Sequence, residues 1–543
     1  MKKYLSFVKK YALTSKLNIF IIICILITQN IPALVIPILY KKIIDVYLPN
    51  KDIDFTIMFL GIILIMNIGK LILNILKDYE SALFSENIGK NIRIDLMKKV
   101  IFLPYGYFDN NNISNFLSKY DKEVNTLITD LGYMLIRLIS SLISISMTAY
   151  MIVYLSGKYL IAFAFVFVVF LKTSVHFGKK VSKRAEVFFE KNNSSLSVIS
   201  DNYRNIPLIK LYNGYKFAIK RFNEKYNSQF CSKIKLEIIN SVNINVSGFW
   251  IFFLTFVAWV IGVNDIMKGA LTIGGLIAII DYLNMLMSPM NFIPQFIGSY
   301  RESLVAIERI NSFLNQNDEK NELQKIVYSK GNISKVLVNN VSFGYSKDRN
   351  VISNLNLEFN KGNIYGLIGK SGCGKSTLIK LLIGLYAPNS GEITVSKDGE
   401  MLTPIQVRED FGYLPQESSF FEDTIYNNLC FDSEIDKDLI IKESKKIDIF
   451  QELNNMDEKL DTKINYENSN LSGGQKKRLD LLRILIRDKN IIICDEATSF
   501  LDDKRKEYFY RTINEIKKEK IIIIITHNND ESKYFDKIYE IGT

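Results

Sequence analysis

The sequence contains few of the residues that most often build metal centres, with two histidines and five cysteines in 543 residues. The cysteines form neither a Cys-x-x-Cys pair nor the spacing of a metal-ligand set. This pattern excludes a zinc site of that kind and gives no indication of a disulfide framework. The cysteines are Cys24, Cys231, Cys373, Cys430 and Cys494.

Acidic residues are also in the minority, because 57 Asp and Glu stand against 68 Lys and Arg, for a net charge of +11. A basic protein can bind nucleic acid, but the chain has no DNA-reading motif and no interleaving of aromatic and basic residues. A membrane protein with basic cytoplasmic loops explains the excess more simply. We therefore expect a lipid bilayer among the partners, and no nucleic acid.

Long apolar runs are concentrated in the N-terminal part of the chain, although the mean hydropathy is only +0.09. A chain of 543 residues is too long for one compact core, so two or more domains are expected. A membrane span needs about 20 apolar residues. Six segments satisfy this requirement, at about 17–39, 54–76, 131–155, 157–177, 247–266 and 270–294.

The spacing of the six segments predicts how they are connected. Short turns join spans three and four and spans five and six, whereas long polar connections of helical character follow spans two and four. We expect the membrane helices to continue through these connections beyond the bilayer. The basic N-terminus precedes an apolar run that is too long for a signal peptide and has no small-residue cleavage site, which predicts an uncleaved first span.

The second long connection is strongly basic and contains few acids to offset the charge. By the positive-inside rule this connection and the basic N-terminus are cytoplasmic, which predicts a multi-pass protein of the cytoplasmic membrane with both termini in the cytosol. A soluble bundle of six apolar helices would not need runs this long. The basic residues are Lys172, Lys179, Lys180, Lys183, Arg184, Lys191, Arg204, Lys210, Lys216, Lys220, Arg221 and Lys225.

A phosphate-binding loop follows the predicted strand Ile364–Ile368 and precedes a predicted helix, Thr377–Leu385. Its glycines let backbone N–H groups converge on phosphates, and the helix adds its positive dipole end. Lys375 is expected to reach the β- and γ-phosphates of ATP, and Ser376 to ligate Mg²⁺. The residues assigned to the ATP site here are Gly369, Lys370, Ser371, Gly372, Cys373, Gly374, Lys375, Ser376 and Thr377.

A second hydrophobic strand, Ile491–Cys494, ends in the adjacent acids Asp495 and Glu496. Two adjacent acids at a strand end can simply belong to a solvated turn. Together with a phosphate-binding loop, however, they indicate a catalytic site. Asp495 suits Mg²⁺ coordination through water. Glu496 is placed to polarise the attacking water as a general base.

Between these two motifs lies Leu471-Ser472-Gly473-Gly474-Gln475. With it the chain resembles ATP-binding cassette (ABC) transporters, for which this sequence is the signature. The resemblance implies that Ser472, Gly473, Gly474 and Gln475 contact the γ-phosphate of ATP bound to an opposite subunit.

The resemblance extends to four further positions. Gln416 matches the glutamine that contacts Mg²⁺ and the membrane domain, and His527 matches the histidine that contacts the γ-phosphate. Ser499–Asp502 is similar to the loop that crosses the dimer interface. Tyr345 matches the aromatic residue that stacks on adenine.

The membrane region is similar to that of exporter-type half-transporters, with six helices fused to one nucleotide-binding domain. Leu103–Asp109 and Asn205–Asn213 resemble the two cytoplasmic loops whose short coupling helices dock on the nucleotide-binding domains. The fold class expected is therefore an all-α, six-span membrane domain with long cytoplasmic extensions, followed by an α/β P-loop ATPase domain. The predicted boundaries are 1–314 for the membrane domain, 315–335 for a linker and 336–543 for the ATPase.

Three positions depart from the family pattern. Asn465-Tyr466 replaces the usual Gly-Glu before the signature, with Glu467 displaced by one, and Phe500 replaces an alanine. The sequence ends at Thr543, soon after the last predicted strand, where the family usually has a helical extension. None of these departures removes a catalytic group.

A composite ATP site implies a second half-transporter, and the complete set of site residues favours a homodimer while leaving a heterodimer open. The expected activity is ATP-driven export of a hydrophobic, amphipathic or peptide substrate. Two alternatives remain open: an ATP-gated channel and an importer on the same fold.

Three charged residues within the apolar spans are candidates for contact with the substrate. Asp281 lies deepest in its span and is expected either to bind a cationic group in the transport cavity or to form an interhelical hydrogen bond or salt bridge, for example with Lys70. Arg137 is expected at the membrane interface.

Overall fold

The computed structural model describes residues 2–11, 16–110, 113–319, 331–346, 349–370, 372–431, 433–465, 471–498 and 503–541. The chain forms two compact units. The first contains Met1–Lys99 and Ser114–Gln316, and the second contains Val100–Ile113 and Asn317–Thr543.

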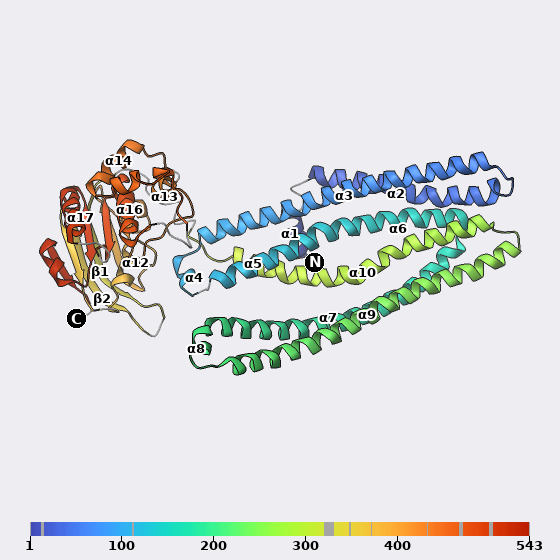
Figure 1. Cartoon of the computed structure of the whole chain (residues 1–543), viewed down its shortest axis with the longest axis horizontal. Helices are drawn as coiled ribbons and strands as arrows, with labels where there is room; N and C mark the ends of the chain where they lie inside the picture. The colour runs from blue at the N-terminus through green and yellow to red at the C-terminus, as the bar shows by residue number, and fades with distance from the viewer. Residues whose placement is uncertain are drawn as a thin grey trace. The chain divides into compact units, whose positions relative to one another are not determined.

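The first unit is built from helices, most of them long (Figure 1). The segment η1 is a π-helical stretch that ends the helix beginning as α2, and η2 is a π-helical stretch inside the continuous helix formed by α5 and α6. The helices are α1 (Lys2–Tyr11), α2 (Lys16–Lys42), η1 (Ile43–Tyr47), α3 (Ile53–Ile101), α5 (Ile113–Leu127), η2 (Ile128–Tyr133), α6 (Met134–Ser156), α7 (Lys158–Arg204), α8 (Ile206–Leu211), α9 (Tyr215–Met267) and α10 (Ile273–Leu314).

Within the described residues, five helical stretches are long and apolar enough to cross a membrane, and they contain the first five predicted spans. The sixth predicted span lies in α10, where the apolar helical part that the structure describes, Ile273–Met287, is shorter. The stretches in α7 and α9 have 47 and 53 residues. At 1.5 Å per residue they extend about 70 to 80 Å, well beyond a hydrocarbon core of about 30 Å, which confirms that these helices continue outside the bilayer.

The core of this unit lies where α6, α7, α9 and α10 pack together. Tyr159, Phe170, Leu254 and Tyr282 are among its buried side chains. In each of the five apolar stretches, at most 22% of the most apolar window is buried inside the unit. The remaining apolar surface needs lipid or another protein chain to cover it.

Asp45 caps the N-terminus of α10. Its Oδ1 accepts a hydrogen bond from the Gly274 backbone N–H at 2.9 Å, and its Oδ2 accepts one from the Thr272 hydroxyl at 2.5 Å. The Thr272 oxygen in turn accepts from the Gly275 N–H at 3.1 Å. A side chain at Gly274 would come within 2.8 Å of Asp45, so this glycine allows the close approach.

The second unit contains two sheets. The first sheet is antiparallel, in the order β2-β1-β4-β5, and the second is parallel, in the order β6-β7-β8-β3-β9. The strands are β1 (Ile333–Phe343), β2 (Ile352–Asn360), β3 (Ile364–Ile368), β4 (Ser390–Lys397), β5 (Glu400–Leu402), β6 (Phe411–Leu414), β7 (Ile491–Asp495), β8 (Ile521–Ile525) and β9 (Lys537–Glu540).

Several helices accompany the sheets in this unit (Figure 1). The α-helices are α4 (Tyr105–Asn110), α12 (Lys375–Leu382), α13 (Ile425–Cys430), α14 (Lys437–Lys446), α15 (Phe450–Asn454), α16 (Gly473–Ile486) and α17 (Asp503–Ile516). The 3₁₀ segments are η3 (Arg408–Asp410), η4 (Lys459–Asp461), η5 (Lys517–Glu519) and η6 (Asn529–Tyr534).

Strands β3, β7 and β8 coincide with the hydrophobic runs that predicted them. Strand β1 begins at Ile333, within the predicted linker 315–335, and residues 320–330 of that linker lie outside the described residues. In the parallel sheet Leu367 and Asp495 both pair with Ile525. The loops that follow β3, β7 and β8 therefore leave the sheet at one edge.

We expect Asp45→Ala to destabilise the first unit by about 1 to 2 kcal/mol, because α10 would lose a charged cap on its N-terminus. The measurement is thermal unfolding of the purified full chain in detergent. Asp54→Ala, an exposed acid in the first turn of α3, is the matched control and should leave the melting temperature nearly unchanged. Equal melting temperatures for all three proteins would contradict the capping role.

Candidate ATP site

The phosphate-binding loop joins β3 to α12. Gly372 and Gly374 adopt φ angles of 85° and 99°, a left-handed conformation that glycine accepts without strain. Gly374 is the N-cap of α12, so the helix begins at Lys375, two residues before the predicted Thr377. Ser371 lies outside the described residues.

The side chain of Lys375 folds back over this loop. Its Nζ donates to the carbonyl oxygens of Gly369 at 2.6 Å and of Lys370 at 3.0 Å. Ser376 is exposed in the first turn of α12. The Thr377 hydroxyl lies 3.1 Å from the hydroxyl of Tyr345, whose side chain is 51% exposed. The exposed ring of Tyr345 thus lies within hydrogen-bonding reach of the loop.

Glu496 holds three loops of the parallel sheet together. Its Oε2 accepts a hydrogen bond from Gln416 Nε2 at 2.9 Å, and its Oε1 lies 3.2 Å from His527 Nδ1. Its backbone N–H donates to Ile525 O at 3.0 Å, and its φ is 48°. Gln416, Glu496 and His527 lie far apart along the chain, and the sequence predicted them in one site. The structure brings them into contact.

Asp495 differs from Glu496 in being only 5% exposed. Burial raises its pKa above the usual carboxyl value, and the neighbouring charge of Glu496 raises it further. Ser376, Gln416 and Asp495 supply oxygen donors of the kind that Mg²⁺ prefers. Among the described residues no group of three or more His, Cys, Asp or Glu forms a separate metal cluster. The residues present fit Mg²⁺ held jointly by these oxygens and by phosphate oxygens, and not a metal held by protein alone.

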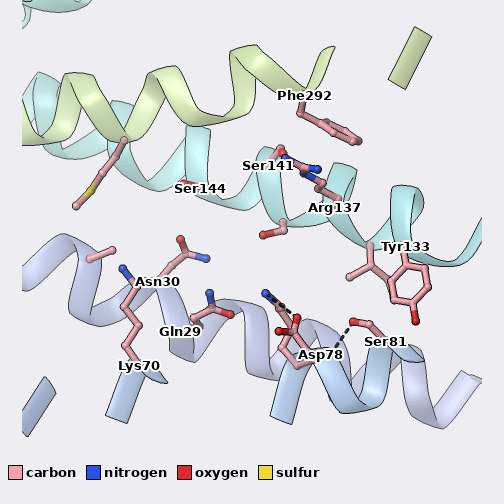
Figure 2. Close-up of a pocket in the computed structure, with 15 residues that line it drawn as sticks. Gln29, Asn30, Lys70, Asp78, Ser81, Tyr133, Arg137, Ser141, Ser144 and Phe292 are labelled. Atoms are coloured by element: carbon pink, nitrogen blue, oxygen red, sulfur yellow. Dashed lines mark hydrogen bonds and ion pairs between the residues drawn. The ribbon is translucent and has the colours of Figure 1, made fainter. Parts of the chain in front are cut away.

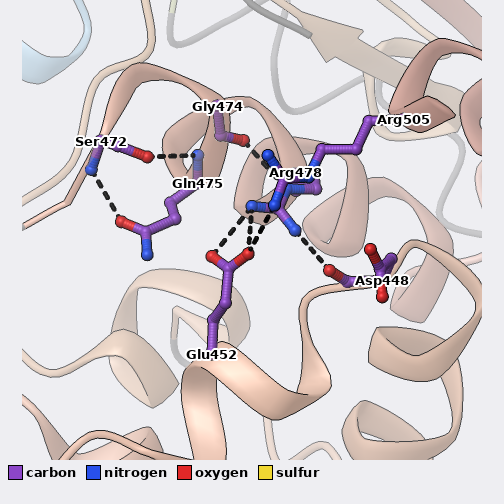
Figure 3. Close-up of polar contacts among 7 residues, drawn as sticks. All are labelled: Asp448, Glu452, Ser472, Gly474, Gln475, Arg478 and Arg505. Atoms are coloured by element: carbon purple, nitrogen blue, oxygen red, sulfur yellow. Dashed lines mark hydrogen bonds and ion pairs between the residues drawn. The ribbon is translucent and has the colours of Figure 1, made fainter. Parts of the chain in front are cut away.

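The signature residues begin α16, with Ser472 as its N-cap (Figure 3). The Ser472 hydroxyl accepts from the Gln475 N–H at 3.2 Å, and the Gln475 side-chain oxygen accepts from the Ser472 N–H at 2.7 Å. Gly473 and Gly474 form the first turn, where no side chain covers the backbone. A helix N-terminus is a kind of site that can bind an anion, and here its capping groups satisfy one another.

Lys477 is a site residue that the sequence reasoning missed. Its side chain is 3% exposed, and its Nζ donates to the carbonyl oxygen of Gln416 at 2.8 Å and to that of Pro415. Burial lowers the pKa of this lysine. The sequence signal for it was weak, because α16 carries several other charged residues; Lys477 is followed by buried Leu479, Leu481 and Leu482.

Arg478, the next residue, fixes α16 to α15 and to the turn that precedes it. Its guanidinium donates to both carboxylate oxygens of Glu452, at 2.7 and 2.9 Å, and to the carbonyl oxygen of Asp448 (Figure 3). Arg505 of α17 binds the same carboxylate at 3.2 Å. These contacts set the position of the signature helix independently of any bound nucleotide.

The predicted first coupling segment forms α4, which packs beside the aromatic residues around Tyr345. Asp109 Oδ2 accepts from the Tyr386 hydroxyl at 2.5 Å and from Lys380 Nζ at 3.2 Å. These two partners hold the pKa of Asp109 below its usual value. The ring of Tyr386 lies 5.9 Å from Tyr105 and 5.5 Å from Tyr345, so one tyrosine touches both α4 and the candidate adenine residue.

The second predicted coupling segment forms α8 in the first unit. Pro207 occupies its first turn, where the missing N–H of proline costs no hydrogen bond. Some predicted positions lie outside the described residues. They are the interface loop Ser499–Asp502, which includes Phe500, and the departures from the family pattern at Tyr466 and Glu467.

The structure places two of the three charged span residues at one cavity and the third elsewhere. Lys70 and Arg137 line one cavity of the first unit (Figure 2), whereas Asp281 does not line it. Among the ion pairs of the described residues, none joins Lys70 to Asp281. The expectation of an ion pair between them is wrong, because Asp281 on α10 lies outside the cavity that Lys70 lines.

We expect Lys477→Met to lower the free energy of unfolding of the second unit by about 1 to 3 kcal/mol, because two buried carbonyl oxygens would lose their donor. Differential scanning calorimetry of the full chain measures this change. Lys476→Met, at the neighbouring position of α16, should change it by less than about 0.5 kcal/mol. Equal effects of the two substitutions would show that the buried contact contributes nothing.

Comparison with known proteins agrees with this geometry. The family described as ABC transporter transmembrane region matches residues 19–290, and the family described as ABC transporter matches residues 352–499. A solved structure described as a bacterial Atm1-family ABC exporter with ATP bound shares the fold. Its TM-score is 0.80 at 19% sequence identity, over 97% of this chain and 93% of that chain.

Three curated proteins are similar in sequence. A protein of Rickettsia typhi, named for export ATP-binding/permease function, is 27% identical over 100% of this chain and 93% of its own length. An ABC transporter ATP-binding protein of Bacillus subtilis is 24% identical over 99% and 93%. A mitochondrial iron-sulfur clusters transporter of Chaetomium globosum is 30% identical over 61% and 55%. The chain belongs to the ABC transporter family, as an exporter-type half-transporter that joins a helical membrane domain to an ATP-hydrolysing domain.

Proposed function

We propose that two copies of the chain form the working exporter, with each ATP held between the loop Gly369–Ser376 of one copy and the signature residues of the other. The observation that carries this proposal is the contact of Gln416 and His527 with Glu496 beside the phosphate-binding loop. One chain carries every group that hydrolysis needs, which supports a homodimer with two competent sites.

Each residue has a distinct part in this proposal. Lys375 exchanges its two loop carbonyls for phosphate oxygens when ATP binds, because both acceptors belong to the loop that surrounds the phosphates. Ser376, Gln416 and Asp495 would hold Mg²⁺, which would offset the charge of the phosphates. Tyr345 stacks on the adenine through its exposed ring.

Glu496 accepts a proton from the attacking water, and His527 orients this carboxylate while donating toward the γ-phosphate. The side chain of Gln416 is bonded to Glu496 and its backbone oxygen to Lys477. Movement of Gln416 therefore reaches both the catalytic base and the signature helix. This linkage supports a pump over an ATP-gated channel, since a gate has no use for a complete hydrolytic set.

The cargo is a hydrophobic, amphipathic or peptide molecule that crosses the cytoplasmic membrane. The basic connection in α7 and α9, with the basic N-terminal helix α1, supports a cytosolic position for both termini and for the ATPase.

Glu496→Gln should retain ATP binding and lower the turnover number at least 100-fold, because an amide cannot accept the proton of water. Steady-state hydrolysis and equilibrium binding of ATP are the two measurements. Glu417→Gln, an exposed acid beside Gln416, is the control and should hydrolyse ATP at the wild-type rate. Hydrolysis near wild type in Glu496→Gln would remove this residue from its role.

Mixed dimers test the shared site directly. A chain with Lys375→Ala and a chain with Ser472→Arg should each be inactive alone, whereas the coexpressed pair should regain hydrolysis. In the pair, one site combines an intact loop with an intact signature from the other chain. The pair is isolated through two different affinity tags and assayed for ATP hydrolysis. A pair no more active than either parent would contradict a site shared between chains.

A further inference from the structure

The two loops that carry Glu496 and His527 are joined at a second, buried place. Thr498 follows Glu496 by two residues, and Glu531 follows His527 by four, in the segment η6. The Thr498 hydroxyl donates to Glu531 Oε1 at 2.6 Å. Both side chains are buried, so water does not compete for this bond. The proposed function uses neither residue.

The contacts between the loops close a ring. At one end His527 Nδ1 lies 3.2 Å from Glu496 Oε1, and the His527 side chain is 69% exposed. A hydrogen bond at an exposed place competes with water and fixes little by itself. The backbone bond from Glu496 N–H to Ile525 O holds the loops only where they leave the sheet. The buried bond of Thr498 to Glu531 is therefore the contact that can fix the distance between the loops beyond that point.

The turn between His527 and Glu531 is bonded internally. The Asn528 N–H donates to the Thr526 hydroxyl at 3.0 Å, and Asn528 Oδ1 accepts from the Asp530 N–H at 3.0 Å. The Glu531 N–H donates to Asn528 O at 3.3 Å. Because these bonds keep the turn together, a shift of Glu531 also shifts His527.

The carboxylate of Glu531 is buried but only half satisfied. Its Oε2 has no hydrogen-bond partner among the described residues, and neither has the buried hydroxyl of Tyr510. Burial raises the pKa of Tyr510, and the nearby charge of Glu531 raises it further. A buried carboxylate with an unbonded oxygen costs stability. Its presence is better explained by the position it imposes on its neighbours than by the stability of the fold.

The segment η6 has an anchor that does not depend on Glu531. The ring of Tyr510 on α17 stacks on the ring of Tyr534 in η6, with 3.9 Å between the centroids and an angle of 6° between the planes. Loss of the Glu531 carboxylate leaves this stacking in place. We therefore expect η6 to stay folded while its distance from the loop of Glu496 is released.

We propose that Glu531 is a positioning residue for ATP hydrolysis, and that it acts through His527. By holding Thr498 it fixes the turn of His527 against the loop of Glu496, so that the imidazole lies against the catalytic carboxylate. This inference rests on the proposed function of His527 and names a residue on which that function depends.

The test is a double-mutant cycle on the turnover number, measured with the full chain in detergent at saturating ATP and Mg²⁺. His527→Ala should lower turnover at least about 20-fold, and Glu531→Met about tenfold, because a misplacement of about 1 Å can cost a catalytic group about 100-fold. The double variant should be no more than about twofold slower than His527→Ala, whereas independent effects would multiply to about 200-fold.

Three further variants separate position from folding. Glu531→Gln keeps an oxygen that accepts from Thr498 and should retain at least about half of the turnover. Thr498→Val removes the donor and should lower turnover about as much as Glu531→Met. Tyr510→Phe keeps the stacked ring, and this matched control should hydrolyse ATP at the wild-type rate. Equilibrium binding of ATP should stay within about twofold of the wild type in all of them, because only the chemical step loses a positioned group.

Effects that multiply in the double variant would overturn the positioning role, because they would show that Glu531 does not act through His527. Equal losses in Glu531→Gln and Glu531→Met, or unchanged turnover in Thr498→Val, would also overturn it. Wild-type turnover in His527→Ala would instead overturn the part of His527 in the proposed function, and the inference would fall with it.

Discussion

The contact between Gln416 and Glu496 is the interaction on which the rest of the ATPase depends. Glu496 follows β7 in a left-handed conformation, and the parallel register brings the ends of β6 and β8 beside it. Its carboxylate is then bonded to Gln416, whose backbone oxygen is held by Lys477 of α16. Under the proposed function, the group that activates water is thus connected, through two contacts, to the helix whose N-terminus would serve the ATP of the other chain.

The aromatic contacts of Tyr386 place a second constraint on the same unit. The candidate adenine residue, Tyr345, is hydrogen-bonded to Thr377 at the start of α12 and packs edge-on against Tyr386. Tyr386 is bonded to Asp109 of α4, a segment that continues from the membrane helix α3. A base stacked on Tyr345 would therefore lie one side chain away from the first cytoplasmic loop.

The sequence predicted those parts of the fold that depend on local pattern. The runs of isoleucine in β7 and β8 and the glycines of the phosphate-binding loop specify strands and a turn from neighbouring residues alone. Lys477 and Tyr386 could not be found in this way, because their roles arise from partners at Pro415, Gln416 and Asp109 that only tertiary packing brings near. The beginning of β1 at Ile333 was also missed, since it follows a polar stretch without apolar periodicity.

The prediction for Asp281 shows most clearly what a hydropathy pattern leaves undecided. A charge inside an apolar run signals function or pairing, but the run does not say which side of the helix faces a cavity. Lys70 and Arg137 belong to different helices, yet both line one cavity. A charge inside an apolar run therefore has to be located on its helix, and against the neighbouring helices, before a role can be assigned to it.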